Sequence, residues 1–214
     1  MKILVLSAHA DDETFGMGAT IKKLADEGAE INIFVLSDGT TAQYEDKKMI
    51  EVRRESCIKA GEILGVQDFD FLNFPDGKLD TISTLEITQK IKDKISNFEP
   101  NIIFTTPNND GHQDHRKVHD CTLIASRPKD FRIGKIIQYE LFSTIKTSFN
   151  PNLFIDISNE FLTKIDAIKQ YDSEIESYPH VRSIEAVENL ACIRGVESGF
   201  QKAEAFKIIR SYAL

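Results

Sequence analysis

Two clusters of ionisable residues in this chain have the types and spacing to do chemistry. The first comprises His9, Asp11, Asp12 and Glu13, four ionisable side chains within five positions. It directly follows residues 3–6, a short continuous apolar run that predicts a strand buried on both faces. One imidazole and three carboxylates at the end of a buried strand are costly to desolvate unless a cation lies beside them. We therefore predict a metal ion at this cluster.

The second cluster comprises His112, Asp114 and His115, about a hundred residues later in the chain. It follows residues 101–105 (NIIFT), another short apolar run that predicts a buried strand. In a doubly wound sheet, the loops that leave the two strands at the switch point flank the crevice where ligands bind. We therefore expect the two clusters to meet at one crevice.

Strands and helices alternate along the chain, which predicts a three-layer, Rossmann-like α/β sandwich. We expect a mainly parallel sheet of strand order 3-2-1-4-5 with helices on both faces. The expected strands cover 3–6, 30–36, 69–73, 101–105, 135–142 and 153–157, and the expected helices cover 15–28, 47–64, 84–98, 113–126, 159–173 and 182–193. Residues 206–209 fit either a helix or an edge strand. The 214 residues contain no repeat or linker, so we expect one domain over 1–214.

The metal ligands predicted from this arrangement are His9, Asp12 and His115. Catalytic zinc is typically held by three protein ligands and keeps a fourth position for water. His9 and Asp12 are three residues apart, so one turn can aim both at the same ion, and His115 arrives from the opposite side. Asp11 is then left facing the bound water, where it can act as general base.

His112 is expected to assist at the other side of the reacting group. Asp114 lies two positions on, and a neighbouring carboxylate favours the protonated form of a histidine and fixes its ring. A protonated His112 can stabilise a developing oxyanion or donate a proton to a leaving amine. These parts suit water attack on an amide, and they suit a phosphoester as well.

The motifs as a set resemble a known family. AHADDETFGMGAT is followed by SDGT, RRES, LGV, FPDG, GHQDHRKVH and a late RGVESGFQKAEAF. In this order they resemble the PIG-L (LmbE-like) family of zinc-dependent N-acetylglucosaminyl deacetylases. The resemblance implies metal ligation by His9, Asp12 and His115, a base at Asp11, and oxyanion or acid help from His112. It also implies a substrate that carries an N-acetylglucosamine-like sugar, with acetate as a product.

The chain departs from the family at Ala10, where the family usually has proline. Alanine leaves the turn that carries the ligands less preset, because it does not fix φ. Zinc is the expected cofactor, although a site of two histidines and one aspartate also accepts iron, cobalt or manganese.

Two further residues are candidates for substrate binding. The family match makes Arg53 a candidate for gripping a sugar hydroxyl or a phosphate. On its own, the long amphipathic helix around it also fits a solvated or ion-paired arginine. Asp76, in the turn after the third strand, can accept a hydrogen bond from a sugar hydroxyl, although Pro-Asp-Gly is also ordinary turn chemistry.

Three other ionisable residues have open roles. Glu13 either orients His9 or is an ordinary acid in the first turn of a helix. His119 shares a helical face with His115, and a packed or hydrogen-bonded helix histidine explains it better than a ligand does. His180 follows Pro179 and could reach the crevice from a late loop.

Composition excludes several classes of protein. The net charge of −8 and the absence of a Lys/Arg run argue against nucleic-acid binding. Three cysteines without a CxxC pair predict reduced thiols in a cytoplasmic protein and argue against a zinc–thiolate site. No apolar stretch is long enough to span a membrane. Dinucleotide binding is not expected, because Gly16 and Gly18 lack the third glycine of the GxGxxG motif and acids occupy the turn before them.

The expected partner is thus a small-molecule amino-sugar conjugate, without nucleic acid and without membrane insertion, and a homo-oligomer is left open. Two other functions fit the same residues. A metal-dependent esterase or phosphoesterase would share the metal and release a different product. A sugar-binding module without catalysis would use the crevice alone.

Overall fold

The computed structural model describes residues 1–40, 48–142 and 149–212. Its strands are β1 (Lys2–Ser7), β2 (Glu30–Ser37), β3 (Asp68–Phe74), β4 (Ile102–Thr105), β5 (Lys135–Tyr139), β6 (Leu153–Asp156) and β7 (Ala203–Ser211). They form one seven-stranded sheet of order β3-β2-β1-β4-β5-β7-β6. The strands from β3 to β5 are parallel, which confirms the predicted order 3-2-1-4-5, and β7 pairs antiparallel with both of its neighbours.

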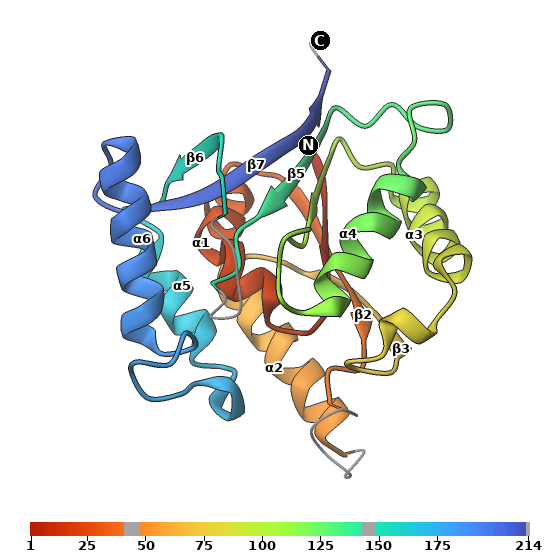
Figure 1. The fold of residues 1–214 in the computed structure, drawn as a ribbon. Coiled ribbons are helices and arrows are strands. Elements are labelled where there is room, and N and C mark those ends of the chain that lie inside the picture. Colours follow the sequence, from red (N-terminus) through yellow and green to blue (C-terminus); the bar gives the residue numbers. More distant parts are fainter. Residues whose placement is uncertain (41–47, 143–148, 213–214) are drawn as a thin grey trace.

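Helices cover both faces of the sheet, as predicted (Figure 1). They are α1 (Asp12–Asp26), α2 (Lys48–Leu64), α3 (Thr84–Phe98), α4 (Gln113–Ala125), α5 (Phe161–Ile168) and α6 (Ile184–Ser198), with short 3₁₀ turns at Leu79–Thr81 and Asp172–Glu174. The helices α3 and α4 lie on one face, and α1, α2 and α5 lie on the other (Figure 1). Residue 47, the expected start of α2, lies outside the described residues.

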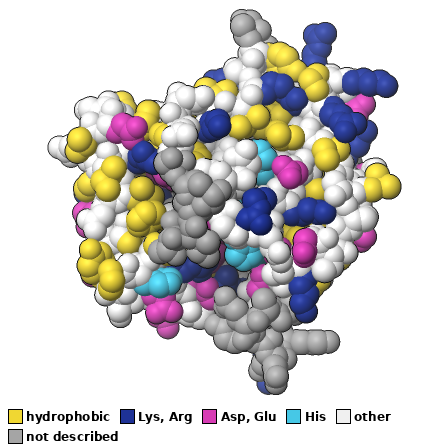
Figure 2. All heavy atoms as spheres, in the orientation of Figure 1, with side chains coloured by type: hydrophobic (Ala, Val, Ile, Leu, Met, Phe, Trp, Pro, Cys, Tyr) yellow, Lys and Arg dark blue, Asp and Glu magenta, His cyan; other side chains and the backbone are white. Residues whose placement is uncertain are grey.

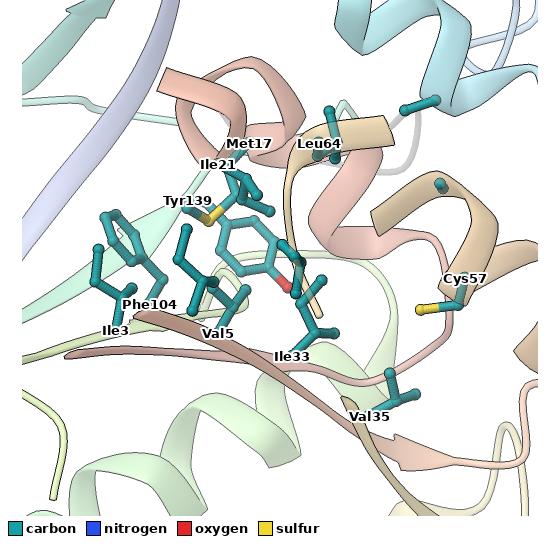
Figure 3. Packing of buried hydrophobic residues seen from close by; sticks show 14 of the residues in the cluster. Ile3, Val5, Met17, Ile21, Ile33, Val35, Cys57, Leu64, Phe104 and Tyr139 are labelled. Atoms are coloured by element: carbon teal, nitrogen blue, oxygen red, sulfur yellow. The ribbon is translucent and has the colours of Figure 1, made fainter. Parts of the chain in front are cut away.

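Strand β1 is buried on both faces, and its side chains alternate between two cores. Ile3 and Val5 pack with Met17 of α1 and Tyr139 of β5, as Figure 3 shows. Leu4 and Leu6 of β1 face the second core, under α3 and α4. The continuous apolar run therefore predicts a central strand correctly, because each of its faces is covered by helices.

The segment 206–209 is part of strand β7 and pairs there with β5, so the helix alternative is wrong and the strand alternative is correct. Strand β6 pairs with β7 over Ala203–Phe206. Strand β7 starts at Ala203 and is hydrogen-bonded on both sides, and β6 takes the edge of the sheet. Phe206 is fully buried against Phe104 of β4, with ring centroids 5.6 Å apart. Glu204 interrupts the apolar pattern of this strand, and its carboxylate is neutralised by Lys164, 2.7 Å away.

Several element boundaries differ from those expected. Strand β5 stops at Tyr139, and α5 ends at Ile168, four residues before the 3₁₀ turn that begins at Asp172. Helix α6 runs on to Ser198 because Gly199, with φ of +82°, provides the left-handed residue that ends it. Helix α1 begins at Asp12, which makes this residue part of its first turn.

Helix α1 is kinked at Met17, whose φ and ψ are −145° and 23°. A Cβ at Gly16 would lie 2.5 Å from the ring of Tyr139, so only glycine allows the helix to pass this close to β5. Beyond the kink, the backbone N–H groups of Ala19 and Thr20 donate to Glu204, at 3.1 and 2.7 Å. The kink thus fixes α1 between the loop after β1 and the late strand β7.

Candidate active site

The loops after β1 and β4 bring the two predicted clusters together. These strands are neighbours in the sheet, so their carboxyl ends open onto the same crevice. The rings of His9 and His115 have centroids 5.2 Å apart, and His9 Nδ1 lies 3.3 Å from His115 Nε2. A histidine side chain lies among acidic and basic side chains near the centre of the face drawn in Figure 2.

Asp12 completes a triangle of donor atoms with these two histidines. Its Oδ1 lies 3.2 Å from His115 Nε2, and its Oδ2 lies 3.5 Å from His9 Nδ1. Oδ2 also accepts the backbone N–H groups of Ala8 and His9, at 3.0 and 2.8 Å, so Oδ1 is the oxygen that remains for an ion. A tetrahedral ion with bonds of about 2.0–2.2 Å separates its ligands by about 3.3 Å. The distances from His115 Nε2 to His9 Nδ1 and to Asp12 Oδ1 match this separation, and the 3.5 Å contact of His9 Nδ1 is with the other Asp12 oxygen, Oδ2.

Carboxylates lie against the outer nitrogens of both rings. His9 Nε2 is 3.0 Å from Asp76 Oδ1, and His115 Nδ1 is 3.0 Å from Asp110 Oδ2. A carboxylate at the outer nitrogen favours a proton there and leaves the inner nitrogen as a lone-pair donor. Asp110 was not predicted, although an acid in the loop after the fourth strand and just before the histidines is a signal that could have found it.

Two other groups of described residues could also hold a metal ion, namely His9 with His112 and His115, and His9 with Asp76 and Asp114. Their ligand atoms are already in use. His112 Nδ1 accepts the backbone N–H of Asp114 at 3.2 Å, and the Asp114 carboxylate accepts two backbone N–H groups. These groups and the cluster of His9, Asp12 and His115 share His9, so they are overlapping candidates for one cation site.

The pKa values of this triangle indicate that it requires positive charge. Burial opposes the charged form of both histidines, but Asp12, Asp114 and Asp76 together outweigh it and raise the pKa of His9 well above its usual range. In the same way, Asp12 and Asp110 raise the pKa of His115 to about 9. Burial favours the neutral form of Asp12, but the two histidines hold its pKa well below the usual range. A divalent cation would supply the charge that protons otherwise supply here.

Asp11 lies beside this triangle in a network of two arginines and two carboxylates. Its Oδ2 accepts from Arg182 at 2.6 Å and from Arg53 at 3.3 Å. Both arginines also contact Glu174, with Arg182 at 2.6 Å. The Oδ1 atom of Asp11 is buried and has no hydrogen-bond partner among the described residues. One oxygen of this carboxylate is thus held in place while the other remains available.

Sequence reasoning missed both Glu174 and Arg182. They come from the segment between α5 and α6, and neither follows a strand end or belongs to a short motif. Glu174 is buried, whereas the Arg182 side chain keeps 32% of its surface exposed at the crevice. No local signal marks them, because their importance comes from the carboxylate that the fold places opposite them.

His112 caps the amino terminus of α4, and the expected contact between its side chain and that of Asp114 is not formed. The part of Asp114 that contacts the ring is its backbone N–H, which donates to Nδ1, so neutral His112 carries its proton on Nε2. Burial and the neighbouring His9 and His115 lower the pKa of His112, which corrects the expected protonated form. The Asp114 carboxylate instead accepts from the N–H groups of Gly77 and Leu79, and lies 3.4 Å from His9.

The two predicted substrate-binding residues are both buried. Arg53 is 4% exposed and bridges Asp11 and Glu174, in agreement with an ion-paired arginine. Asp76 is 6% exposed and lies against His9. The structure therefore brings both to the site, where they contact the residues expected to do the chemistry.

The remaining histidines and Glu13 lie outside the reacting centre. Glu13 is fully buried and accepts from Ser7 and Tyr171, at 3.0 and 2.9 Å, so it is not the partner of His9. It is an acid in the first turn of α1, which is the other alternative that the sequence left open. His119 is a buried helix histidine whose Nδ1 lies 3.0 Å from the carbonyl oxygen of Thr106. His180 is exposed, and its ring accepts the backbone N–H of Arg182.

The fold and the site define a three-layer α/β protein with a candidate metal centre where β1 and β4 end. The PIG-L family model, described as GlcNAc-PI de-N-acetylase, matches residues 4–126, which include both clusters. An uncharacterized deacetylase of Escherichia coli K12 is 34% identical to this chain over 178 residues, covering 80% of this chain and 90% of that protein. The chain therefore belongs to the PIG-L family.

Two further relatives cover nearly the whole chain. The diacetylchitobiose deacetylase of Thermococcus kodakarensis is 28% identical over 229 residues, covering 97% of this chain and 83% of that protein. The structure of N,N'-diacetylchitobiose deacetylase from Pyrococcus horikoshii, complexed with its inhibitor, shares the fold, with a TM-score of 0.82 at 24% identity. That comparison covers 97% of this chain and 83% of the other. No helix among the described residues has the length and apolar character to cross a bilayer.

Proposed function

We propose that this protein is a zinc-dependent hydrolase that removes the acetyl group from an N-acetylglucosamine-type sugar conjugate, and that residues 1–214 form its single catalytic domain. The observation that carries the proposal is the cluster of His9 Nδ1, His115 Nε2 and the Asp12 carboxylate, in which the contacts between residues are 3.2 to 3.5 Å and the two histidines meet different oxygens of Asp12. Membership in the PIG-L family and the names of the curated relatives support the substrate class.

His9, Asp12 and His115 are the residues that would hold the ion. When bound, a divalent metal polarises a carbonyl oxygen and lowers the pKa of water to about 7. Zinc fits two imidazoles and a carboxylate, and Fe²⁺, Co²⁺ and Mn²⁺ also accept such ligands. Asp76 and Asp114 position His9 through its outer ring nitrogen, and Asp110 does the same for His115. Asp114 thus has a role at His9 in place of its expected role at His112.

Asp11 is the general base of the proposed reaction. Arg53 and Arg182 hold its Oδ2, so the buried Oδ1 is the oxygen that takes the proton from the attacking water. A positioned base of this kind is typically worth about 10²–10⁴-fold in rate. Water adds to the acetyl carbon, the C–N bond breaks, and acetate and the free amine leave.

His112 assists as a neutral donor through its Nε2–H. Its ring is held by the backbone N–H of Asp114, so the donor direction is fixed before the substrate binds. A preorganised donor at a developing oxyanion stabilises the transition state more than the substrate. The leaving amine takes the proton that Asp11 removed from the water, so His112 donates a hydrogen bond and keeps its own proton.

The sugar hydroxyl groups are proposed to bind near Arg53 and Asp76. Both carry charge that suits hydroxyl recognition and both adjoin the reacting residues. We also propose a cytoplasmic location, supported by Cys57, Cys121 and Cys192, which are free thiols in the structure.

The test is acetate release from a panel of N-acetylglucosaminides, with the metal content of the purified protein measured alongside. We expect acetate and one equivalent of free amine, loss of activity with a chelator, and recovery on adding zinc. His115→Ala should lose the metal and the activity together. Phosphate release from a phosphoester in place of acetate would favour the phosphoesterase, and full sugar binding without metal would favour the binding module.

A further inference from the structure

A cavity of about 270 Å³ opens directly beside the candidate metal ligands. Asp12 and His115 line one end of it, together with Asp11 and His112. The other end lies between α1, the end of β5, α5, α6 and β7. Its walls there include the apolar residues Phe15, Val187, Leu190, Ala191, Ala203 and Ala205.

The charged residues in these inner walls already neutralise one another. Arg194 donates to both carboxylate oxygens of Glu140, at 2.8 and 2.5 Å, and Lys164 donates to Glu204 at 2.7 Å. Lys164 and Glu204 are each only 4% exposed. The inner end therefore offers an occupant apolar surface and no net charge.

The size of the cavity exceeds what an acetyl group needs. An engineered apolar cavity of about 150 Å³ in another protein admits benzene, so 270 Å³ has room for a chain of about six carbons. A pyranose placed at the inner end would set its hydroxyl groups against apolar walls and against charged side chains that are already ion-paired, and a hydroxyl group left without a partner is costly to bury. An aliphatic chain carries no such groups.

The position of the cavity distinguishes the two apolar chains that an amino-sugar substrate can carry. The N-acyl chain begins at the carbonyl carbon, the atom that reacts beside Asp12 and His115. The aglycone begins at the anomeric carbon, several bonds away from it. Because Asp12 and His115 line this cavity, the acyl chain attached to the reacting carbonyl carbon enters it before the aglycone can.

We propose that this cavity is an acyl-chain pocket, and that the enzyme hydrolyses N-acyl glucosamines whose acyl chain is longer than acetyl. The inference rests on the proposed hydrolase function. The step is the same hydrolysis: water adds to the acyl carbon, the C–N bond breaks, and a fatty acid and the free amine are released. No oxidant or further reactant is required.

The first test is a chain-length series of N-acetyl-, N-butyryl- and N-hexanoylglucosamine with the metal-loaded enzyme. Each methylene that becomes buried is worth about fourfold in affinity. We therefore expect kcat/KM to rise along the series, by about tenfold or more in total. A kcat/KM for the N-hexanoyl substrate no higher than that for N-acetylglucosamine would overturn the proposal.

A second arm separates the acyl chain from the aglycone. The hexyl glycoside of N-acetylglucosamine carries the same six carbons at the anomeric position. We expect it to gain no more than a small part of the increase seen with the N-hexanoyl substrate. A gain for the hexyl glycoside alone would assign the cavity to the aglycone and overturn the proposal.

Variants of the wall supply a matched comparison. Ala191→Phe fills the inner end and should lower the ratio of N-hexanoyl to N-acetyl kcat/KM by at least about fivefold. Val196→Phe, on the same helix with Val196 85% exposed, should leave this ratio unchanged. Ala205→Leu serves if Ala191→Phe does not fold. An unchanged ratio in a folded wall variant would contradict the pocket.

A failure of the proposed function is distinguishable from a failure of this inference. If no N-acyl glucosamine is hydrolysed, the hydrolase assignment fails, and calorimetry with the same protein still tests the cavity. Tighter binding of N-hexanoylglucosamine than of N-acetylglucosamine then supports the pocket, and equal or weaker binding overturns it.

Discussion

The candidate site is built from two regions that hold their side chains in different ways. In residues 1–126, the ligand triangle is set by neighbouring parallel strands, whose ends place His9, Asp12 and His115 within 3.5 Å of one another. In the region after residue 126, Glu174 and Arg182 come from the segment before α6 and reach the site through Asp11. The first region supplies the groups proposed to react, and the second adds Glu174 and Arg182 to their charge balance and most of the apolar wall of the cavity.

The two regions therefore position their side chains by different structural means. The reacting groups follow strand ends, where a sheet fixes backbone positions to within its hydrogen-bond geometry. The later groups are positioned by packing of α5, α6 and β7 against α1. The predictions below test whether the two regions contribute in this way.

The largest effect is expected at Asp11, where the two regions meet. Asp11→Asn removes the base while it keeps the shape of the side chain, so kcat should fall by about 10²–10⁴-fold. Metal content should stay near that of the wild type, because Asp11 is not one of the three proposed ligands. Steady-state kinetics with metal analysis checks this, and unchanged turnover would exclude Asp11 as the base.

A smaller effect is expected for the carboxylates behind the histidines. Asp76→Asn and Asp110→Asn should each weaken metal binding by about 10–100-fold, because each removes the partner of an outer imidazole nitrogen. Competition with a chromogenic chelator measures the affinity. Asp166→Asn, an exposed acid on α5, is the control and should bind metal like the wild type.

In the later region, Arg182→Ala should reduce kcat by about tenfold with little change in metal content. The variant frees Asp11 Oδ2 from its 2.6 Å partner and leaves Arg53 as the remaining cation beside it. The loss is smaller than for Asp11→Asn, because the base itself remains. If Arg182→Ala instead lost the metal, the separation between the two regions would be wrong.

The smallest effect concerns stability and pH. Burial raises the pKa of Glu13 from 4.5 to about 7, so the folded protein binds this proton more tightly than the unfolded chain does. The contribution of Glu13 to stability is therefore full below about pH 4.5 and is lost as pH rises to about 7, by roughly 3 kcal/mol at most. Denaturant unfolding of the wild type and Glu13→Gln across this range measures it, and the variant should show a flatter pH profile. Equal profiles would show that Glu13 is ionised in the fold.

Much of the fold was predictable because it depends on patterns local to each element. Apolar runs at 3–6 and 101–105 mark strands covered on both faces, and their alternation with helices gives the parallel order around β1. The antiparallel strand β7 was not predictable in the same way, since Glu204 breaks its apolar pattern. That charge is tolerated only because Lys164 and the N–H groups freed by the α1 kink lie opposite.

In the site, the convergence of His9, Asp12 and His115 could be predicted from strand order. The orientation of His112 could not be predicted. Asp114 contacts the ring through its backbone N–H and not through its carboxylate, because His112 caps the amino terminus of α4. Arg182 and Glu174 could not be found either, since their partner is fixed by tertiary packing. Arg53 shows the intermediate case: its place at the site was expected, and its ion pairs were visible only in three dimensions.

The most direct test of the account is the structure of the zinc-loaded protein. It should show one ion about 2.0–2.2 Å from His9 Nδ1, an oxygen of Asp12 and His115 Nε2, with a coordination position left open. Asp11 Oδ1 should face that open position. An ion held by His9, Asp76 and Asp114, with His115 left unbound, would contradict it.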